Sequence, residues 1–331
     1  MLSIRTVVGA TLCVGVLAVS LAASGAARGA DQPKRLTIGA TNPQISHYAY
    51  FAAVSKLINQ KIDGYTSNVI ETGATIDNLN RMQRGQIDLG LITSNSLHEA
   101  YYGKGKFSDK PVKSGLLWLY SEAPQLIVVT RESGIDSIEG LNGKPMGPGP
   151  RGSSTEQTSV AAMKLLSIEP KWVRGSMPEL TNAIKDARSL GVIHTAVKAS
   201  YQPVVMEVHA TRPLRVLGLT DAQVEKIAKG LPEISILEVP ANKTDLGTAA
   251  PVKTWAFLVG VSAAPNLAED DAYRIVKAVM EDKVEQKAAF AGLVAEGLIE
   301  ATLKNARSPL HPGAIRYYEE RGYTIPARLR P

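Results

Sequence analysis

The sequence predicts an α/β fold with two doubly wound lobes joined by a hinge of two strands. Short apolar strand patterns alternate with helical patterns along the chain, which is typical of a parallel sheet covered by helices. The segments 84–90 and 190–196 occupy equivalent places in two successive units, each after a helix of similar length. Two apolar runs, 126–130 and 254–262, are suited to cross between the units, and two crossings make a hinge.

The first lobe is expected to open with a strand, a loop and a helix. The segment after Ser46 places apolar side chains on one face with helical spacing, and Thr75 can cap a further helix that ends before Gly85. A nearly continuous apolar run then predicts a buried strand with Asp88 inside it. The expected strands of this lobe cover 35–40, 67–71 and 86–93.

The second lobe is expected to repeat this order. Two apolar runs lie between 115 and 130, separated by Ser121, Glu122 and Pro124, and we expect 126–129 to form the better strand. Capping boxes at 153–156 and 176–179 mark the starts of two helices. The other expected elements are a short capped helix at 136–143, an apolar strand at 192–197, a strand at 254–262, and helices at 269–280, 284–295 and 312–321. We therefore place lobe 1 at 31–128 plus 255–331, and lobe 2 at 129–254.

Residues 1–30 have the pattern of a secretory signal peptide. Arg5 is followed by an uncharged run that lasts until Arg28, and small residues near its end offer cleavage points. The run is long enough to span a bilayer, so an uncleaved anchor is the alternative. Cys13 is the only cysteine and lies inside this segment, so the mature chain is expected to have no thiol or disulfide chemistry. We therefore predict a periplasmic protein.

Charge and motif content argue against several classes of protein. The formal charge is +6, and it becomes +4 without Arg5 and Arg28. Basic and acidic residues are interleaved, so we expect no nucleic-acid partner. The five histidines lack metal-ligand spacing, and neither a Gly-x-Ser-x-Gly elbow nor a phosphate-binding loop is present. We therefore expect neither catalytic activity nor a cofactor or metal site. A hydrolase whose residues assemble only in space is the remaining enzyme alternative.

The segment 147–156, Gly-Pro-Gly-Pro-Arg-Gly-Ser-Ser-Thr-Glu, indicates an anion-binding helix start. A helix begins with N–H groups that have no partner in the helix and with the positive end of its dipole. Glycines let the main chain approach a ligand, and a guanidinium can bind a carboxylate in two-pronged fashion. The alternative is an ordinary capped helix after a surface turn. The ligand contacts predicted here are Arg151, Gly152, Ser153, Ser154 and Thr155.

Three polar residues, Thr93, Ser94 and Asn95, follow the apolar strand that contains Asp88. Open α/β sheets bind ligands at the carboxyl ends of their strands, so we expect these three side chains to contact the ligand. Simple turn residues are the alternative. His194, like Asp88, lies within an apolar strand and is expected to be a satisfied structural group.

The chain resembles the solute-binding receptors of the TAXI family, a branch of the tripartite ATP-independent periplasmic (TRAP) transporters, from about residue 36 to 322. The motifs that carry the resemblance are Glu-Thr-Gly-Ala-Thr-x-Asp-Asn-Leu at 71–79, Gly-Gln-Ile-Asp-Leu-Gly at 85–90, the loop at 147–156, and Leu-His-Pro-Gly-Ala-x-Arg-Tyr-Tyr at 310–318. The resemblance implies a type II periplasmic binding protein fold, a ligand held between the lobes, and delivery to a fused TRAP membrane permease.

One loop departs from the family pattern. Members usually carry a glycine-rich loop after the first strand, whereas this chain has Pro43, which removes a backbone donor. Polar side chains stand where the family has bare backbone, and we expect them to bind the ligand. Tyr48 can also cover an apolar part of the ligand, with core packing as the alternative. The predicted contacts from this loop are Asn42, Gln44, Ser46 and Tyr48.

These expectations combine into a non-catalytic receptor. The family ligands resemble glutamate, 2-oxoglutarate and related small carboxylates, so the expected ligand is a dicarboxylate, a 2-oxo acid or an acidic amino acid. The ligand is expected to favour a closed state in which the loops of both lobes reach it together. An extracytoplasmic sensing module that reports to a membrane signalling partner is the alternative function.

Overall fold

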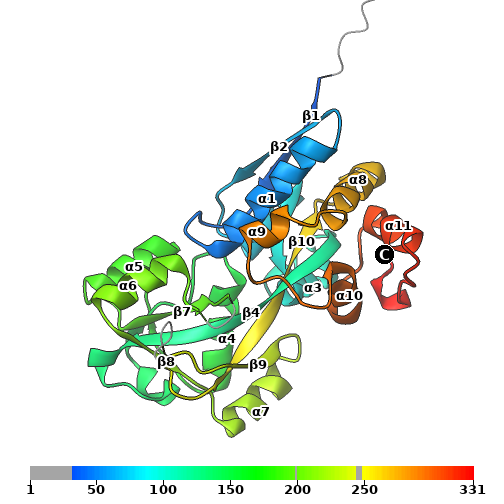
Figure 1. Ribbon diagram of the computed structural model, residues 1–331. Coiled ribbons are helices and arrows are strands. Elements are labelled where there is room, and N and C mark those ends of the chain that lie inside the picture. Colours follow the sequence, from blue (N-terminus) through cyan, green and yellow to red (C-terminus); the bar gives the residue numbers. More distant parts are fainter. Residues whose placement is uncertain (1–31, 198–199, 244–247) are drawn as a thin grey trace, which may run out of the picture. The chain divides into compact units, whose positions relative to one another are not determined.

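The computed structural model describes residues 32–197, 200–243 and 248–331 (Figure 1). The predicted signal peptide lies outside these ranges. Within them, no helix combines the length and the apolar character needed to cross a bilayer. The strands are β1 (Lys34–Gly39), β2 (Tyr65–Ile70), β3 (Leu89–Thr93), β4 (Gly115–Thr130), β5 (Pro145–Met146), β6 (Lys171–Trp172), β7 (Gly191–Thr195), β8 (Leu214–Leu217), β9 (Ser235–Val239) and β10 (Val252–Ala263).

Helices α1 to α7 lie between strands, and α8 to α11 follow β10. Helix α5 begins at the predicted capping box, in which the Glu179 carboxylate accepts a hydrogen bond from Ser176 N at 2.7 Å. The helices are α1 (Ser46–Lys61), α2 (Thr75–Gln83), α3 (Ser94–Tyr102), α4 (Ser154–Leu165), α5 (Met177–Lys185), α6 (Pro203–Thr211), α7 (Asp221–Gly230), α8 (Glu269–Met280), α9 (Glu285–Ala289), α10 (Leu298–Asn305) and α11 (Pro312–Glu320).

Two long strands connect the lobes. The sheet order is β2-β1-β3-β10-β4-β7, with β1 parallel to β2 and β3, and with β10 antiparallel to β3 and β4. The C-terminal part of β4, residues 125–130, pairs with β7 and β8. The N-terminal part of β10, residues 252–256, pairs with β9. Both strands run from one group of helices to the other in Figure 1. The α/β fold, its two doubly wound lobes and the type II periplasmic binding arrangement are therefore confirmed.

Strand β4 is continuous, so the expected break at Ser121, Glu122 and Pro124 is wrong. Pairing with β10 ends at Pro124, and pairing with β7 begins at Gln125. The missing N–H of Pro124 therefore lies where the strand changes partners and interrupts neither ladder. A sequence pattern does not reveal this change of partner, because the partners come from distant parts of the chain.

The predicted helix at 284–295 is longer than the observed helix, so this prediction is also wrong. Helix α9 ends at Ala289, and Phe290 takes an extended conformation. Its ring packs against Tyr50 and Tyr120, with centroid distances of 5.9 and 5.6 Å. Burial of this aromatic side chain in the core outweighs continuation of the helix. A separate helix, α10, follows after Gly297.

The described part of the chain contains three buried apolar clusters. The first cluster draws on residues 36–123 and 259–329, and the other two draw on 126–257. Ile45 is an exception, because it follows β1 and nevertheless belongs to the second cluster. The clusters lie on both sides of the crossing strands. The exact lobe limits, 31–128 plus 255–331 and 129–254, stay a prediction.

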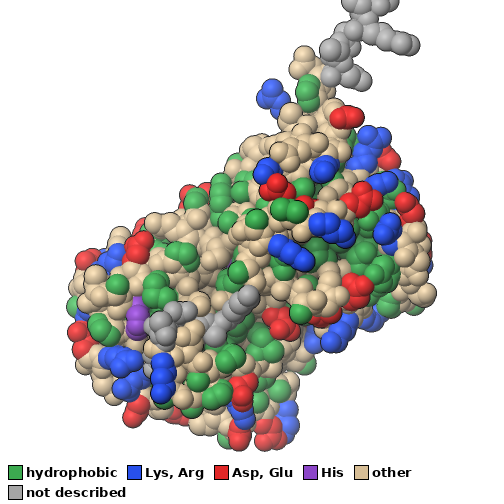
Figure 2. Space-filling model, in the orientation of Figure 1, with side chains coloured by type: hydrophobic (Ala, Val, Ile, Leu, Met, Phe, Trp, Pro, Cys, Tyr) green, Lys and Arg blue, Asp and Glu red, His purple; other side chains and the backbone are tan. Residues whose placement is uncertain are grey.

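The surface is mixed in charge. On the face shown in Figure 2, Lys and Arg side chains are interspersed with Asp and Glu side chains over both groups of helices. This distribution agrees with the interleaving of charge along the sequence.

Candidate functional site

A cavity of about 50 Å³ lies where helices of both lobes begin. Among the described residues, α1 to α6 each contribute a lining residue from their first turn or N-cap. Helix starts carry partial positive charge and unpaired N–H groups, which favours an anion nearby. The lining residues are Thr41, Ile45, His47, Ala74, Thr75, Leu91, Thr93, Pro150, Ser153, Ser154, Thr155, Met177, His194, Thr195, Gln202, Phe257 and Val259.

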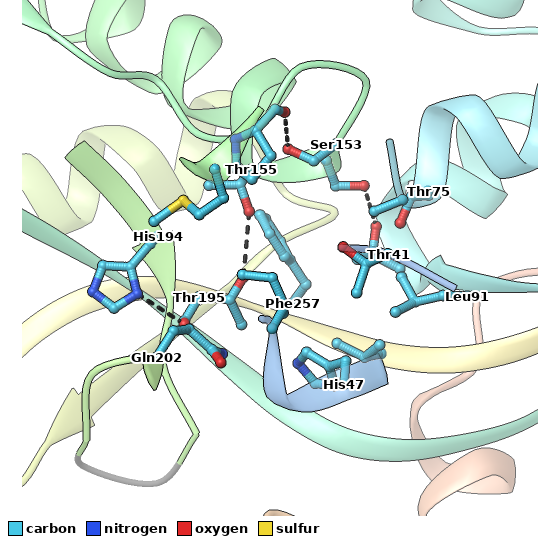
Figure 3. Close-up of a pocket in the computed structure, with 17 residues that line it drawn as sticks. Thr41, His47, Thr75, Leu91, Ser153, Thr155, His194, Thr195, Gln202 and Phe257 are labelled. Atoms are coloured by element: carbon cyan, nitrogen blue, oxygen red, sulfur yellow. Dashed lines mark hydrogen bonds between the residues drawn. The ribbon is translucent and has the colours of Figure 1, made fainter. Parts of the chain in front are cut away.

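The cavity also lies at the carboxyl ends of strands. Thr41 follows β1, Thr93 ends β3 and Thr195 ends β7. Figure 3 shows Thr41 and Thr75 from lobe 1 on one side, with Ser153 and Thr155 from lobe 2 near them. This is the position at which open α/β sheets bind ligands.

The predicted loop at 147–156 leads into α4, and the start of this helix has the side-chain cap that was expected as the alternative to anion binding. Ser153 Oγ donates to the Pro150 carbonyl at 2.6 Å and accepts from Glu156 N at 3.1 Å, so it caps the helix. The Glu156 carboxylate accepts from Gly152 N at 2.9 Å and pairs with Arg174. The return bond of the capping box therefore reaches Gly152 instead of the N-cap residue.

Arg151 lies apart from this group. Its side chain is exposed and is not part of the cavity lining, while its backbone N donates to the Gly175 carbonyl at 2.8 Å. Gly152 also does not line the cavity, although its carbonyl accepts from Ile76 N and Asp77 N at 3.0 and 3.2 Å. A lobe 2 carbonyl thus caps the start of α2 in lobe 1. Ligand contact by Arg151 and Gly152 stays a prediction.

Hydroxyl groups of the two lobes meet directly at the cavity. Ser154 Oγ lies 2.6 Å from Thr93 Oγ1 and 2.8 Å from Ser96 Oγ. Thr155 Oγ1 donates to Gln125 Oε1 at 2.8 Å and lies 3.3 Å from Thr195 Oγ1. The structure therefore brings together Thr93, Ser153, Ser154 and Thr155 of the predicted set.

Two further predicted residues, Ser94 and Asn95, lie in the first turn of α3 and outside the cavity lining. Asn95 Nδ2 is 3.4 Å from Thr158 Oγ1 on the opposite lobe. The alternative of simple turn residues after β3 is wrong, because α3 begins at Ser94. Asn95 therefore contacts lobe 2 rather than the cavity, and ligand contact by Ser94 and Asn95 stays a prediction.

The loop after β1 lines the cavity with residues other than those predicted. Asn42, Gln44, Ser46 and Tyr48 are outside the lining. Asn42 Oδ1 accepts from Gln44 N at 3.0 Å, Ser46 N donates to Gln202 Oε1 at 2.9 Å, and Tyr48 packs against the first cluster. The lining residues of this loop are Ile45 and His47. The helical spacing of His47 with Tyr50 and Phe51 was a signal for its inward position.

Two buried histidines line the cavity. Burial lowers the pKa of His47 and of His194 to about 4, so both rings are neutral at pH 7. His194 Nδ1–H donates to the Thr195 carbonyl at 3.0 Å, as Figure 3 shows. His194 was expected to be a satisfied structural group, and this bond satisfies one of its two ring nitrogens. The Nε2 atom of each ring has no hydrogen-bond partner among the described residues.

Other lining residues carried no sequence signal. Gln202 and Thr195 come from the lobe 2 side, and Phe257 and Val259 come from β10. The sequence predicted that 254–262 crosses between the lobes, but it did not indicate that Phe257 and Val259 of this strand face the cavity. Within the described ranges, no group of three or more His, Cys, Asp or Glu residues is arranged to hold a metal ion.

The strand order and the two crossing strands define a two-lobed α/β protein with the type II periplasmic binding protein fold. Residues 38–322 match the NMT1-like family, and the chain belongs to this family. Membership of the TAXI branch stays a prediction.

Several solved structures are similar to this chain at low sequence identity. A putative L-cystine ABC transporter protein from Listeria monocytogenes is 13% identical, covers 80% of this chain and 98% of its own, and has a TM-score of 0.48. An alkanesulfonate-binding protein from Xanthomonas axonopodis pv. citri, bound to MOPS, is 15% identical, with coverages of 90% and 96% and a TM-score of 0.46. An ancestral arginine-binding protein bound to arginine is 17% identical, with coverages of 78% and 97% and a TM-score of 0.46.

Proposed function

We propose that this protein is a periplasmic solute-binding receptor that captures a small carboxylate in the cavity between its lobes. The observation that carries the proposal is the convergence of α1 to α6 on the cavity with their N-termini. An anion at a helix start typically gains about 0.3–1 kcal/mol from each helix. Several such ends together favour a carboxylate without requiring a lysine or arginine at the site.

Hydroxyl groups complete the proposed carboxylate site. Thr93 from lobe 1 and Ser154 and Thr155 from lobe 2 are buried and lie beside these helix starts. Hydroxyls can donate to a carboxylate oxygen after a small rotation. Because both lobes supply donors, the ligand would bind the closed arrangement more tightly than an open one. Closure would then be the state that a membrane partner recognises.

We further propose that the receptor delivers its ligand to a TRAP-type permease. The sequence resemblance to TAXI receptors supports this partner. A gene for a large polytopic permease next to the gene for this protein, together with ligand uptake that requires both proteins, would support delivery. A neighbouring histidine kinase without a permease would instead favour the sensing alternative.

The ligand class is tested by thermal shift against organic acids and amino acids, followed by calorimetry on the best compound. Thr155→Val removes a lining hydroxyl, whereas Thr181→Val removes a hydroxyl outside the cavity that bonds the Met177 and Pro178 carbonyls within α5. Both residues are buried, with exposed fractions of 5% and 1%, so the two variants are comparable in burial. We expect about tenfold weaker binding for Thr155→Val only. Equal affinities in the two variants would place the ligand elsewhere, and a panel without a carboxylate hit would exclude the proposed class.

A further inference from the structure

The turn after β1 is built to present one apolar side chain. The Asn42 carbonyl accepts from Ile45 N at 3.0 Å, and Pro43 occupies the second position of this turn, which suits its fixed φ. Asn42 Oδ1 also accepts from Gln44 N, so the polar residues hold the turn itself. Ile45, the N-cap residue of α1, is buried and lines the cavity.

Ile45 packs into the core of the opposite lobe. The other buried residues of its cluster lie between 126 and 239, and Met177 of this cluster also lines the cavity. Gln202 fixes the backbone next to Ile45, because its Oε1 accepts from Ser46 N at 2.9 Å and its Nε2 donates to the Thr195 carbonyl at 2.9 Å. Packing and hydrogen bonds therefore hold Ile45 at the cavity wall when the lobes are together.

The space beside Ile45 is small and partly apolar. A cavity of about 150 Å³ accepts benzene, so the volume of about 50 Å³ leaves room only for a ligand smaller than benzene. Leu91, Met177, Phe257 and Val259 add apolar wall, while the hydroxyls and helix starts provide the polar part. A short carboxylate with an apolar tail matches both parts.

We propose that Ile45 limits the length of the ligand, and that the site selects short monocarboxylates over longer ones. This inference rests on the proposed carboxylate-binding function and narrows it. Dicarboxylates, 2-oxoglutarate and glutamate are longer and would meet the Ile45 side chain in the closed arrangement. Removal of the Ile45 methyl groups opens space for a longer tail without changing the hydroxyls or helix starts.

The experiment is calorimetry of the purified protein with acetate, propionate, butyrate, hexanoate and succinate. We compare the native chain with Ile45→Ala and with Ile234→Ala. Ile234 is also 8% exposed, belongs to the third cluster and does not line the cavity. The native protein should bind propionate at least about tenfold more tightly than hexanoate, and Ile45→Ala should reduce this preference at least about tenfold. Ile234→Ala should keep it.

The outcomes separate this inference from the proposed function. Hexanoate or succinate binding to the native chain as tightly as propionate would overturn the size limit and leave the carboxylate receptor in place. An unchanged length preference in Ile45→Ala would overturn the role of Ile45. If the native chain binds no carboxylate, both proposals fail. Ile45→Val provides a milder change with an intermediate shift expected, should the alanine variant not fold.

Discussion

The hydroxyl of Tyr120 lies 2.9 Å from Nδ1 of His47, and both side chains are buried. Burial raises the pKa of Tyr120 well above its ordinary value, so the hydroxyl keeps its proton. Nδ1 is the one hydrogen-bond partner recorded for this hydroxyl in the described structure. The phenol therefore donates to Nδ1, and the neutral imidazole carries its own proton on Nε2. This assignment fixes His47 as a donor at the cavity wall.

Tyr120→Phe should lower the free energy of unfolding by about 1–3 kcal/mol, because it leaves the buried Nδ1 acceptor without a donor. Urea unfolding at pH 7 measures the change. Tyr102→Phe is the control, since Tyr102 is 47% exposed and should change stability by less than about 0.5 kcal/mol. Nitrogen-15 NMR of the imidazole should show the Nε2–H tautomer of His47 in the native chain. A protonated Nδ1 would contradict the assignment.

Stability should fall on acidification below pH 6.5 because of His47 and His194. Burial lowers the pKa of each ring from 6.5 to about 4 in the folded state. Between these pH values the unfolded chain binds more protons than the folded chain, so the free energy of unfolding decreases as pH decreases. The loss approaches about 3 kcal/mol per histidine near pH 4.

Unfolding by urea at several pH values between 7 and 4.5 checks this dependence. Replacement of either histidine by glutamine removes one titrating group, so each variant should lose less stability on acidification than the native chain. Carboxylate titrations are common to all three proteins and cancel in the comparison. If the free energy of unfolding changed equally with pH in the native and variant chains, the pKa values of these histidines would not be lowered by burial in the folded state.

Local signals predicted the helix starts well. The Ser176–Glu179 capping box is present at α5, and Ser153 caps α4, because these bonds join residues three apart in the chain. The parallel order of β1, β2 and β3 also followed from the alternation of strands and helices. In each case the responsible interactions lie within one short segment or one repeating unit.

The cavity wall was harder to predict because it depends on the opposite lobe. In the loop after β1, polar side chains were expected at the ligand, yet Asn42 and Gln44 form the turn while Ile45 and His47 line the cavity. Nothing in the local pattern indicates that Ile45 packs with residues 126–239. Polarity alone therefore did not identify the side chains of this loop that line the cavity, and ligand contact by the polar ones stays a prediction.

Arg151→Ala separates the sequence-based site from the cavity seen in the structure. The guanidinium is exposed and outside the lining, so we expect less than about a fivefold change in carboxylate affinity, as is typical of a solvated charge (about 0–1 kcal/mol). Calorimetry on the best ligand measures the effect, with the exposed Arg188 replaced by alanine as the control. A loss of tenfold or more for Arg151→Ala alone would restore the two-pronged contact predicted from the sequence.

Ser153→Ala and Ser154→Ala should have different effects although the residues are adjacent and both buried. Ser153 caps α4 within lobe 2, so its loss should reduce the free energy of unfolding by about 1 kcal/mol in urea.

Ser154 instead bonds Thr93 and Ser96 across the lobes. Its loss removes contacts that require the closed arrangement, so small-angle scattering of the ligand-free variant should show a larger radius of gyration than the native protein. The Ser153 variant should keep the native radius, because its hydroxyl bonds do not join the lobes. An unchanged radius in both variants would mean that the Ser154 hydroxyl contributes nothing measurable to closure.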